Sequence, residues 1–404
     1  MSNIDNLIAD RMSLIKPSPT MAVSKLAAEL KAAGKDVIGL GAGEPDFDTP
    51  DHIKRAAIEA IKNGQTKYTA VDGTPKLKKA VSDKFQRDNN IKYNIDEIII
   101  SVGGKQVLFN ALLSSINPGD EVIIPSPYWV SYPDMVALAG GKPIIVEGKS
   151  KNNFKIMPED IKDKISIKTK WIIINSPSNP TGSSYSKKEL KNIGDLLINY
   201  KNIFIMSDDI YEKIIYDDNK FYTIAEVVPE LKDRILTVNG VSKAYAMTGW
   251  RIGYAGGPKT LISAMAKLQS QSTSNPSSIS QAAALAALEG PEDFLSERNA
   301  QFKIRRNMVV EKLNKCKGIH CLLPTGAFYV YPSCKGLIGK QTPAGQIINN
   351  SIDFSSYLLE EVGVAVVPGS AFGADFFFRI SYATSDSILV EACNRIQKAC
   401  DQLI

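Results

Sequence analysis

The chain has 404 residues, of which 44% are hydrophobic, so it is long enough to bury a large core and is expected to form two domains. Its 48 basic and 43 acidic residues are scattered, so the net charge of +5 indicates solubility and provides no basic arm for nucleic acid. No secretory pattern opens the sequence and no apolar run reaches the ~20 residues of a membrane span, so we expect a cytoplasmic protein without membrane contact.

Cysteine and histidine content narrows the possible chemistry. The five cysteines all lie in the last quarter without paired C-x-x-C spacing, which favours reduced thiols over disulfides. Cys316, His320 and Cys321 lack a fourth ligand at a familiar spacing, so we expect no metal site. With only His52 and His320 in the chain, lysine chemistry is favoured over histidine chemistry.

The first predicted element is a helix over 21–33, which ends at Gly34 and follows an irregular arm. The glycine-rich stretch after it imitates a dinucleotide fingerprint, but Glu44 replaces the third glycine and Pro45 forbids the helix that should follow. We therefore reject a dinucleotide-binding fold. The glycines instead indicate either a close approach of backbone to a ligand or a plain tight turn.

Two threonine-proline pairs predict the starts of the next helices. Thr49 and Thr74 are each followed by proline, which indicates a capping residue before helices near 50–63 and 75–89. Tyr68 lies in the loop between these helices, where a surface position is the ordinary interpretation.

Short β-branched strands then alternate with helices through the middle of the chain. This alternation predicts an α/β fold in which a mostly parallel sheet is covered on both faces. Ligands of such sheets bind at the carboxyl ends of the strands. We expect strands at 97–101, 121–124, 143–146, 171–174, 203–207, 235–238 and 252–255.

Polar motifs follow several of these strands. Gly103 and Gly104 precede an apolar-patterned helix, and backbone N–H groups at such a helix start can hold a phosphate. This is not a Walker loop, because the upstream glycine and the hydroxyl residue after Lys105 are missing. Trp129 follows the next strand, where it would either stack on an aromatic ligand or pack in the core.

Two later loops carry an amide and a pair of carboxylates. Prolines on either side of Asn179 fix its loop, so its side chain is presented rigidly. Asp208 and Asp209 end a buried strand, and a carboxylate there needs a cationic partner, which a protonated pyridine nitrogen would supply.

Lys243 occupies an unusual position for a lysine. It lies between two strand-like runs among small and aromatic residues, so partial burial is expected to lower its pKa and leave a nucleophilic amine. Such an amine can form a Schiff base with an aldehyde, while Arg251 and the Ser242 hydroxyl can hold a phosphate. Together these residues indicate a pocket for pyridoxal phosphate, and a snorkelling lysine at a strand end is the alternative.

The C-terminal third is expected to build a second, smaller domain. Arg379 stands alone in an apolar strand, and an arginine so placed usually meets an anion. The other expected features are a helical link over 258–314, core segments at 327–330 and 364–367, a mobile loop at 335–351 and a final helix over 386–402.

The run Ser-Lys-Ala-Tyr-Ala-Met-Thr-Gly-Trp-Arg-Ile-Gly-Tyr around Lys243 resembles the cofactor-lysine signature of class I aminotransferases, which are fold-type I pyridoxal phosphate enzymes. Asn-Pro-Thr-Gly at Asn179 resembles another family motif, and six separated motifs follow the family order along the chain. The resemblance is strongest to the bacterial aspartate aminotransferase subgroup, some members of which also act on prephenate. It implies an N-terminal arm over 1–45 that joins the small domain, a large cofactor domain with a seven-stranded sheet over 46–298, and a C-terminal small domain over 299–404.

The resemblance also implies roles for individual residues. Lys243 is expected to be the catalytic lysine and Asp208 to hold the ring nitrogen, while Asp209 is the competing choice for that role and is disfavoured by the family spacing. The expected cofactor contacts are Gly104, Lys105, Trp129, Asn179, Asp208, Tyr211, Ser242, Arg251 and, from the partner of a homodimer, Tyr68. The expected substrate contacts are Gly43, Trp129, Asn179, Arg379 for the α-carboxylate, Lys105 for a distal carboxylate, and Thr20 and Lys16 on the closing arm. Neutralising the phosphate is the alternative role of Lys105.

The implied activity is ping-pong transfer of an amino group between L-aspartate and 2-oxoglutarate, with prephenate as a further substrate. Aromatic or alanine donors, or a lyase reaction with the same cofactor, are the alternatives within the fold. A non-catalytic ligand-sensing module is the alternative from another class, but it would need a helix-turn-helix extension for which the chain has no residues to spare.

Overall fold

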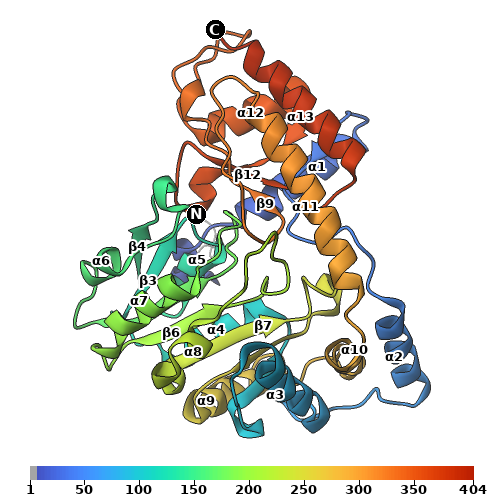
Figure 1. Cartoon of the computed structure of the whole chain (residues 1–404), viewed down its shortest axis with the longest axis vertical. Helices are drawn as coiled ribbons and strands as arrows, with labels where there is room; N and C mark the ends of the chain where they lie inside the picture. Colours follow the sequence, from blue (N-terminus) through green and yellow to red (C-terminus); the bar gives the residue numbers. More distant parts are fainter. Residues whose placement is uncertain (1–6) are drawn as a thin grey trace.

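A seven-stranded sheet lies at the centre of the lower half of the molecule in the computed structural model, which describes residues 7–404 (Figure 1). The strand order is β2-β8-β7-β6-β5-β3-β4. Only β8 runs antiparallel to its neighbours, so the expected mostly parallel sheet is confirmed. The strands are β2 (Ile98–Ser101), β3 (Glu121–Ser126), β4 (Lys142–Glu147), β5 (Thr169–Asn175), β6 (Phe204–Asp208), β7 (Ile235–Gly240) and β8 (Gly253–Gly256), each overlapping its predicted range.

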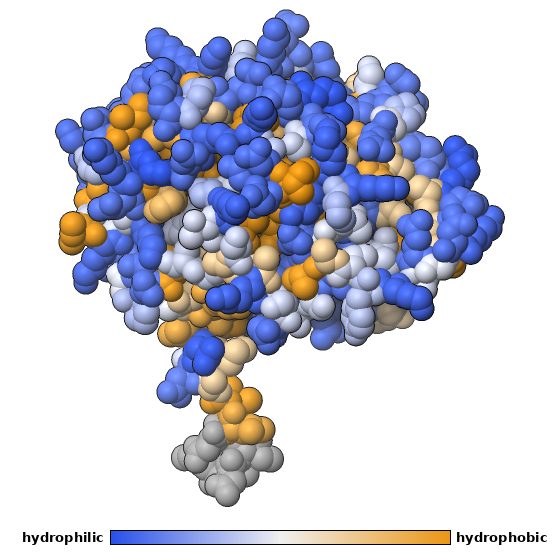
Figure 2. All heavy atoms as spheres, turned by 90° about the horizontal axis from the view of Figure 1, so that it is seen from below, coloured by the Kyte–Doolittle hydropathy of each residue, from blue (hydrophilic) through white to orange (hydrophobic). Residues whose placement is uncertain are grey.

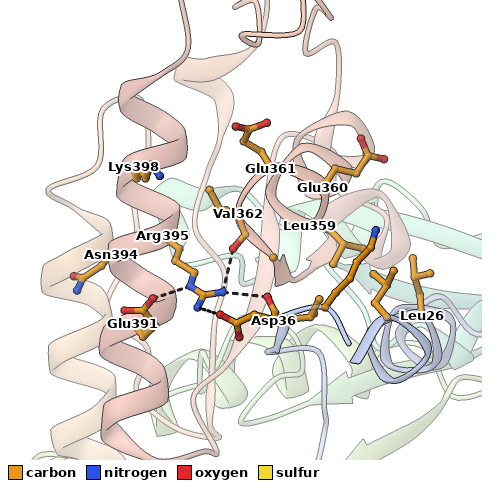
Figure 3. Close-up of a pocket in the computed structure, with 14 residues that line it drawn as sticks. Leu26, Asp36, Leu359, Glu360, Glu361, Val362, Glu391, Asn394, Arg395 and Lys398 are labelled. Carbon is orange, nitrogen blue, oxygen red and sulfur yellow. Dashed lines mark hydrogen bonds and ion pairs between the residues drawn. The ribbon is translucent and has the colours of Figure 1, made fainter. Parts of the chain in front are cut away.

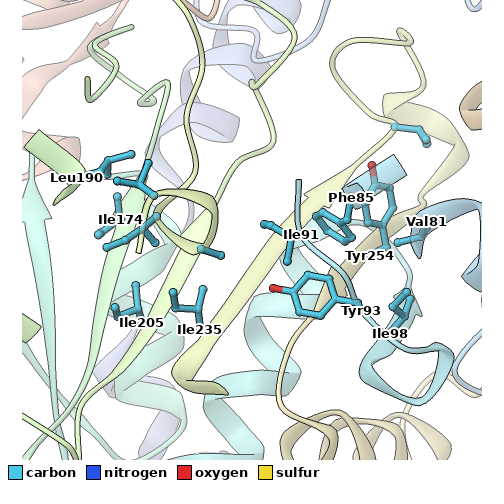
Figure 4. Packing of buried hydrophobic residues seen from close by; sticks show 14 of the residues in the cluster. Val81, Phe85, Ile91, Tyr93, Ile98, Ile174, Leu190, Ile205, Ile235 and Tyr254 are labelled. Carbon is cyan, nitrogen blue, oxygen red and sulfur yellow. The ribbon is translucent and has the colours of Figure 1, made fainter. Parts of the chain in front are cut away.

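Alternate side chains of the strands bury themselves under two helical layers. Ile98 and Ile100 of β2 join the cluster beneath α3 (Pro75–Asn89) and α10 (Ser278–Glu289). Ile99 joins the cluster beneath α4 (Gly104–Ser115) and α9 (Lys259–Ser270). Figure 4 shows the first cluster, in which Phe85 packs edge-on against Tyr93 and Tyr254. Each such fully buried side chain contributes about 1.5–3 kcal/mol of transfer free energy. Apolar side chains on both faces therefore fix the sheet, and its carboxyl edge is left for polar groups.

The helices around the sheet agree with the expected alternation. They are α2 (Asp51–Lys62), α3 (Pro75–Asn89), α4 (Gly104–Ser115), α5 (Ser131–Leu138), α6 (Pro158–Lys162), α7 (Lys187–Ile198), α8 (Ile224–Val227), α9 (Lys259–Ser270) and α10 (Ser278–Glu289). The helical link expected over 258–314 is three helices, since prolines interrupt it and the third, α11 (Phe294–Leu313), leads into the upper half of Figure 1.

A second core lies in that upper half. Its elements are α1 (Pro19–Ala32), α12 (Ser351–Val362), α13 (Asp386–Asp401), β1 (Ile38–Gly39), β9 (Tyr329–Val330), β10 (Val364–Ala365), β11 (Val367–Pro368) and β12 (Phe378–Ser381). β1 pairs with β10, so residues from the N-terminal arm share a core with the C-terminal quarter. The domain boundaries at 45 and 298 stay predictions.

One of the two predicted helix caps differs from the structure. Thr49 does not cap α2, because its hydroxyl donates to the carbonyl oxygen of Ala246 at 2.6 Å, and Pro50 occupies the cap position instead. Thr74 does cap α3, accepting from the N–H of Leu77 at 3.4 Å. The loop expected over 335–351 is irregular apart from the short 3-10 helix Lys335–Leu337, and Gln341 within it exchanges two backbone hydrogen bonds of 3.0 Å with Ile404. Its mobility stays a prediction.

The surface seen from below carries hydrophobic patches among hydrophilic residues, and the N-terminal arm projects from it (Figure 2). On that arm Leu7 is 79% and Ile8 62% exposed. None of the helices over residues 7–404 combines the length and apolar character needed to cross a membrane. The cytoplasmic location stays a prediction.

Candidate active site

Lys243 lies in the connection between β7 and β8, at the carboxyl edge of the sheet. It is half-buried, its Nζ donates to the carbonyl oxygen of Gly43, and it stands 5.8 Å from the ring centre of Tyr211. Desolvation, followed by the charge of Arg379, lowers the pKa of the Lys243 amine to about 8. Part of the amine is therefore unprotonated near neutral pH, as a nucleophile or a base requires.

Asp208 ends β6 and is buried without a cation in ion-pair contact among residues 7–404. The hydroxyl of Tyr132 donates to its Oδ2 at 2.5 Å, and the N–H of Ile210 approaches its Oδ1 at 3.4 Å. Burial raises the pKa of the Asp208 carboxyl. A buried carboxylate in this condition fits a cationic ligand group such as a protonated ring nitrogen.

Asp209 points to the other face of the sheet. Its Oδ1 accepts from the hydroxyl of Ser207 at 2.7 Å, and its Oδ2 has no hydrogen-bond partner among residues 7–404. Burial raises the pKa of Asp209 to about 7. Only Asp208 is bonded to Tyr132, whose ring packs edge-on against Trp129 at 5.3 Å, so the two neighbouring carboxylates have separate environments.

Arg379 of β12 reaches the same region from the second core. Its guanidinium is 2% exposed and donates to Asn179 Oδ1 at 2.8 Å and to the carbonyl oxygen of Gly41 at 2.6 Å. The Nε group has no partner, and no carboxylate of residues 7–404 balances its charge. Burial lowers the pKa of this arginine. A buried guanidinium with a free donor is a site for a carboxylate ligand.

The glycine pair at the start of α4, Gly103 and Gly104, forms a cradle beside Arg251. Gly103 has φ +85°, and a Cβ there would lie 2.4 Å from the Arg251 guanidinium. A Cβ at Gly253 would lie 2.2 Å from the backbone nitrogen of Gly104, the first residue of α4. Only glycine allows these chains to approach so closely. The free N–H groups of a helix start and a guanidinium together suit a phosphate.

Lys105 extends from this cradle over Trp129, with its Nζ 4.8 Å from the ring centre. Desolvation, and then the charge of Arg251, lower the pKa of Lys105. A cavity of about 590 Å³ is lined by Lys105, Arg251 and Lys16 among its polar residues. Thr20 does not line this cavity; it lies in the first turn of α1, where its hydroxyl is 3.0 Å from that of Ser18.

The remaining predicted site residues divide into buried and exposed positions. Ser242 is buried at the start of the lysine loop, and the hydroxyl of Tyr211 lies 2.8 Å from that of Tyr329. Tyr68 is 91% exposed and contributes nothing to the site of its own chain. Ile58 of the adjacent α2 is also exposed, to 49%.

Three contributions were missed by the sequence interpretation: the Tyr132 hydroxyl on Asp208, the Tyr329 hydroxyl on Tyr211, and the Gly41 carbonyl on Arg379. The only available signal was that a buried tyrosine hydroxyl needs a partner, which does not say which partner.

Another cavity lies away from these residues. It has a volume of about 730 Å³ between α1, α12 and α13, and Arg395 crosses it to pair with Asp36 at 2.5 Å and Glu391 at 2.7 Å (Figure 3). None of the predicted site residues lines it. Residues 7–404 contain no group of three or more His, Cys, Asp or Glu side chains placed to hold a metal ion.

Comparison with known proteins agrees with this arrangement. Residues 35–396 match the family model described as aminotransferase class I and II. A probable aspartate/prephenate aminotransferase of Rickettsia felis is 58% identical, over 98% of this chain and 97% of the relative. The crystal structure of the aspartate aminotransferase from Rhizobium meliloti superposes with a TM-score of 0.96 at 54% identity, covering 98% of this chain and 99% of that one. The Thermus thermophilus aspartate aminotransferase with maleate has a TM-score of 0.91 at 41% identity, covering 97% and 99%.

Proposed function

Because the chain belongs to the class I and II aminotransferases, we propose that it transfers the amino group of L-aspartate to 2-oxoglutarate, giving oxaloacetate and L-glutamate. Prephenate is proposed as a further acceptor, as the names of its relatives suggest. The observation that carries the proposal is the buried, unbalanced guanidinium of Arg379 on one side of Lys243, with a second cation, Lys105, over Trp129. Two separate cations suit a dicarboxylate, and maleate, named with the Thermus thermophilus relative, is one.

The residues present fit pyridoxal 5'-phosphate. Gly104, Ser242, Arg251 and Lys105 would hold its phosphate, Asp208 its ring nitrogen, Asn179 and Tyr211 its phenolic oxygen, and Trp129 would stack on its ring. The buried Asp208 carboxylate without a cation and the glycine cradle beside Arg251 support this assignment. When bound, the cofactor supplies an electron sink for the carbanion at the substrate Cα.

Three side chains of the protein have separate roles in the proposed reaction. Arg379 binds the α-carboxylate through its free Nε, assisted by the N–H of Gly43. The Lys243 Nζ would take the proton from the substrate Cα and hold it, for which an amine pKa of about 8 is suitable. Asp208 stays ionised against a bound cation, since that cation removes the penalty that burial imposes on the carboxylate. Two half-reactions through one site imply ping-pong kinetics.

Lys105→Ser is expected to test both the activity and its dicarboxylate specificity. Wild type should turn over aspartate with 2-oxoglutarate. The variant should lose about 10- to 100-fold in kcat/KM for aspartate and glutamate, because a charged hydrogen bond worth about 1.5–3 kcal/mol is removed. Loss for alanine or phenylalanine should stay within about threefold, since neither has a distal carboxylate.

Steady-state kinetics over these donors is the measurement, with cofactor affinity measured in parallel. An equal loss of kcat/KM for all donors, or a weaker affinity for the cofactor, would show instead that Lys105 neutralises the phosphate. A wild type that releases products without consuming 2-oxoglutarate would replace the proposed transfer by a lyase reaction.

Tyr68 is proposed to act in the site of a partner subunit, because it is exposed here and points into no part of its own site. If so, a Tyr68→Phe subunit, itself impaired by at least about tenfold, should recover activity when mixed with Lys243→Ala subunits, since one site of each mixed dimer has both residues. Tagged mixed dimers, purified and assayed, give the answer. Verified mixed dimers with no recovered activity would contradict the assignment.

A further inference from the structure

A group of charged side chains is buried behind the proposed site. Lys84 of α3 is 1% exposed and forms an ion pair with Glu212, which is 7% exposed and directly follows Tyr211. Asn89, at the end of α3, bonds to both: its Nδ2 donates to Glu212 at 3.0 Å and its Oδ1 accepts from Lys84 at 2.7 Å. Removing two charges from water is costly unless each is well bonded. The proposed reaction uses none of these three residues.

The same network continues to the loop of Lys243. Asp88 lies 4.0 Å from Lys84 and pairs with Lys213 at 3.0 Å, and Lys213 pairs with Glu292 at 2.8 Å. The hydroxyl of Tyr245, two residues after Lys243, donates to Glu292 at 2.5 Å. One chain of ionic and hydrogen bonds therefore links α3 to the neighbours of both Tyr211 and Lys243.

The turn that carries Tyr211 is held from two sides. On the side of the second core, the N–H of Ala327 donates to the carbonyl oxygen of Ile214 at 3.0 Å, and the hydroxyl of Tyr329 is bonded to that of Tyr211. On the side of the sheet, Glu212 is tied to α3. The backbone also ties the start of this turn to β7, since the N–H of Asp209 donates to the carbonyl oxygen of Val238 at 2.9 Å. The side chain of Glu212 therefore adds a further attachment next to Tyr211, on the side away from the second core.

We propose that Glu212, fixed by Lys84 and Asn89, is a positioning residue that sets the Tyr211 hydroxyl and, through Tyr245, the Lys243 amine at their working positions. The inference rests on the proposed function, because it gives Tyr211 and Lys243 their roles toward cofactor and substrate. A buried ion pair that served only stability would be replaceable by uncharged side chains of similar volume with little effect on turnover. Displacement of a catalytic group by about 1 Å, in contrast, costs up to about 100-fold in rate.

The test replaces both charges together, by Lys84→Met with Glu212→Gln, so that no single charge is left buried and unpaired. In the holoenzyme we expect the unfolding temperature to stay within about 4 °C of wild type. We expect kcat for aspartate to fall by about 10- to 100-fold while KM stays within about twofold. In the cofactor-free protein, the pH at which Lys243 is modified by an amine reagent, read by mass spectrometry, should rise by about one unit as water reaches the loosened amine.

The matched control is Lys170→Met with Asp120→Asn. This half-buried pair, 3.0 Å apart, lies where β5 and β3 begin, at the opposite ends of the strands from the carboxyl ends that lead to the proposed site. It should change neither kcat nor the labelling pH of Lys243. A stable Lys84/Glu212 double variant with wild-type kcat and wild-type labelling would overturn the inference.

If the double variant does not fold, Asn89→Ala takes its place, because it removes the hydrogen bonds of Asn89 to Glu212 and Lys84 and keeps the ion pair between them. It should lower kcat by at least about threefold without changing KM, and an unchanged kcat would equally overturn the inference. A wild type without aminotransferase turnover would overturn the proposed function instead, and the labelling of Lys243 in the cofactor-free protein would still decide whether Glu212 positions it.

Discussion

Lys243→Ala is expected to lower aspartate turnover by about 10⁴-fold or more, because one change removes both the covalent attachment point and the proton-transferring base. The protein should still fold, since Lys243 is only half-buried and its main contact is one hydrogen bond to the carbonyl oxygen of Gly43. Single-turnover kinetics with aspartate measures the loss. Borohydride treatment followed by mass spectrometry should find cofactor fixed to residue 243 in wild type only.

The exposed Lys201, on the loop before β6, provides a control of the same residue type. Lys201→Ala should leave turnover and cofactor attachment unchanged. Near wild-type turnover in Lys243→Ala, or attachment of the cofactor at another lysine, would refute the central assignment.

Asp208→Asn is expected to lower kcat by about 10²- to 10³-fold with a much smaller effect on cofactor affinity. The physical reason is that an amide cannot balance a buried cation, and an unpaired buried charge costs about 3–5 kcal/mol. Its neighbour is the control: Asp209 bonds to Ser207 on the other face, so Asp209→Asn should change kcat by less than about threefold.

Both variants should be measured side by side, with kcat from steady-state kinetics and cofactor affinity from titration of the cofactor-free protein. The opposite order of the two effects would show that Asp209 carries the ring-nitrogen role. Similar losses in both would point to a structural effect of this strand end.

The sheet could be predicted from the sequence because its signals are local. Runs of β-branched residues such as 171–174 mark strands, and their alternation with helices implies parallel crossovers. Thr49 shows where local rules fail. Its capping pattern is the same as that of Thr74, but a partner 197 residues away, the carbonyl oxygen of Ala246, takes its hydroxyl. The sequence around Thr49 does not show that a distant carbonyl oxygen competes for its hydroxyl.

The site residues also differ in whether a local sequence signal reveals them. Lys243, Asn179 and Arg379 stand out because each is a polar or charged side chain among residues of a different character, within a recognisable motif. Tyr132 and Glu212 do not stand out, since a tyrosine or glutamate in a helix or turn is ordinary until its partner is known. The groups that act on ligands could therefore be predicted, whereas those that orient them needed coordinates.

The five cysteines have a practical consequence for measuring motion. All are free, buried and part of the second core, and none lies in the seven-stranded sheet or its covering helices. A thiol in the interior reacts with an alkylating reagent only after the surrounding structure opens. The rate at which such a reagent labels the folded protein thus reports on opening of the structure around the C-terminal quarter. Peptide mass distinguishes the five labelled positions. The seven-stranded sheet, which has no cysteine, gives no signal in this measurement.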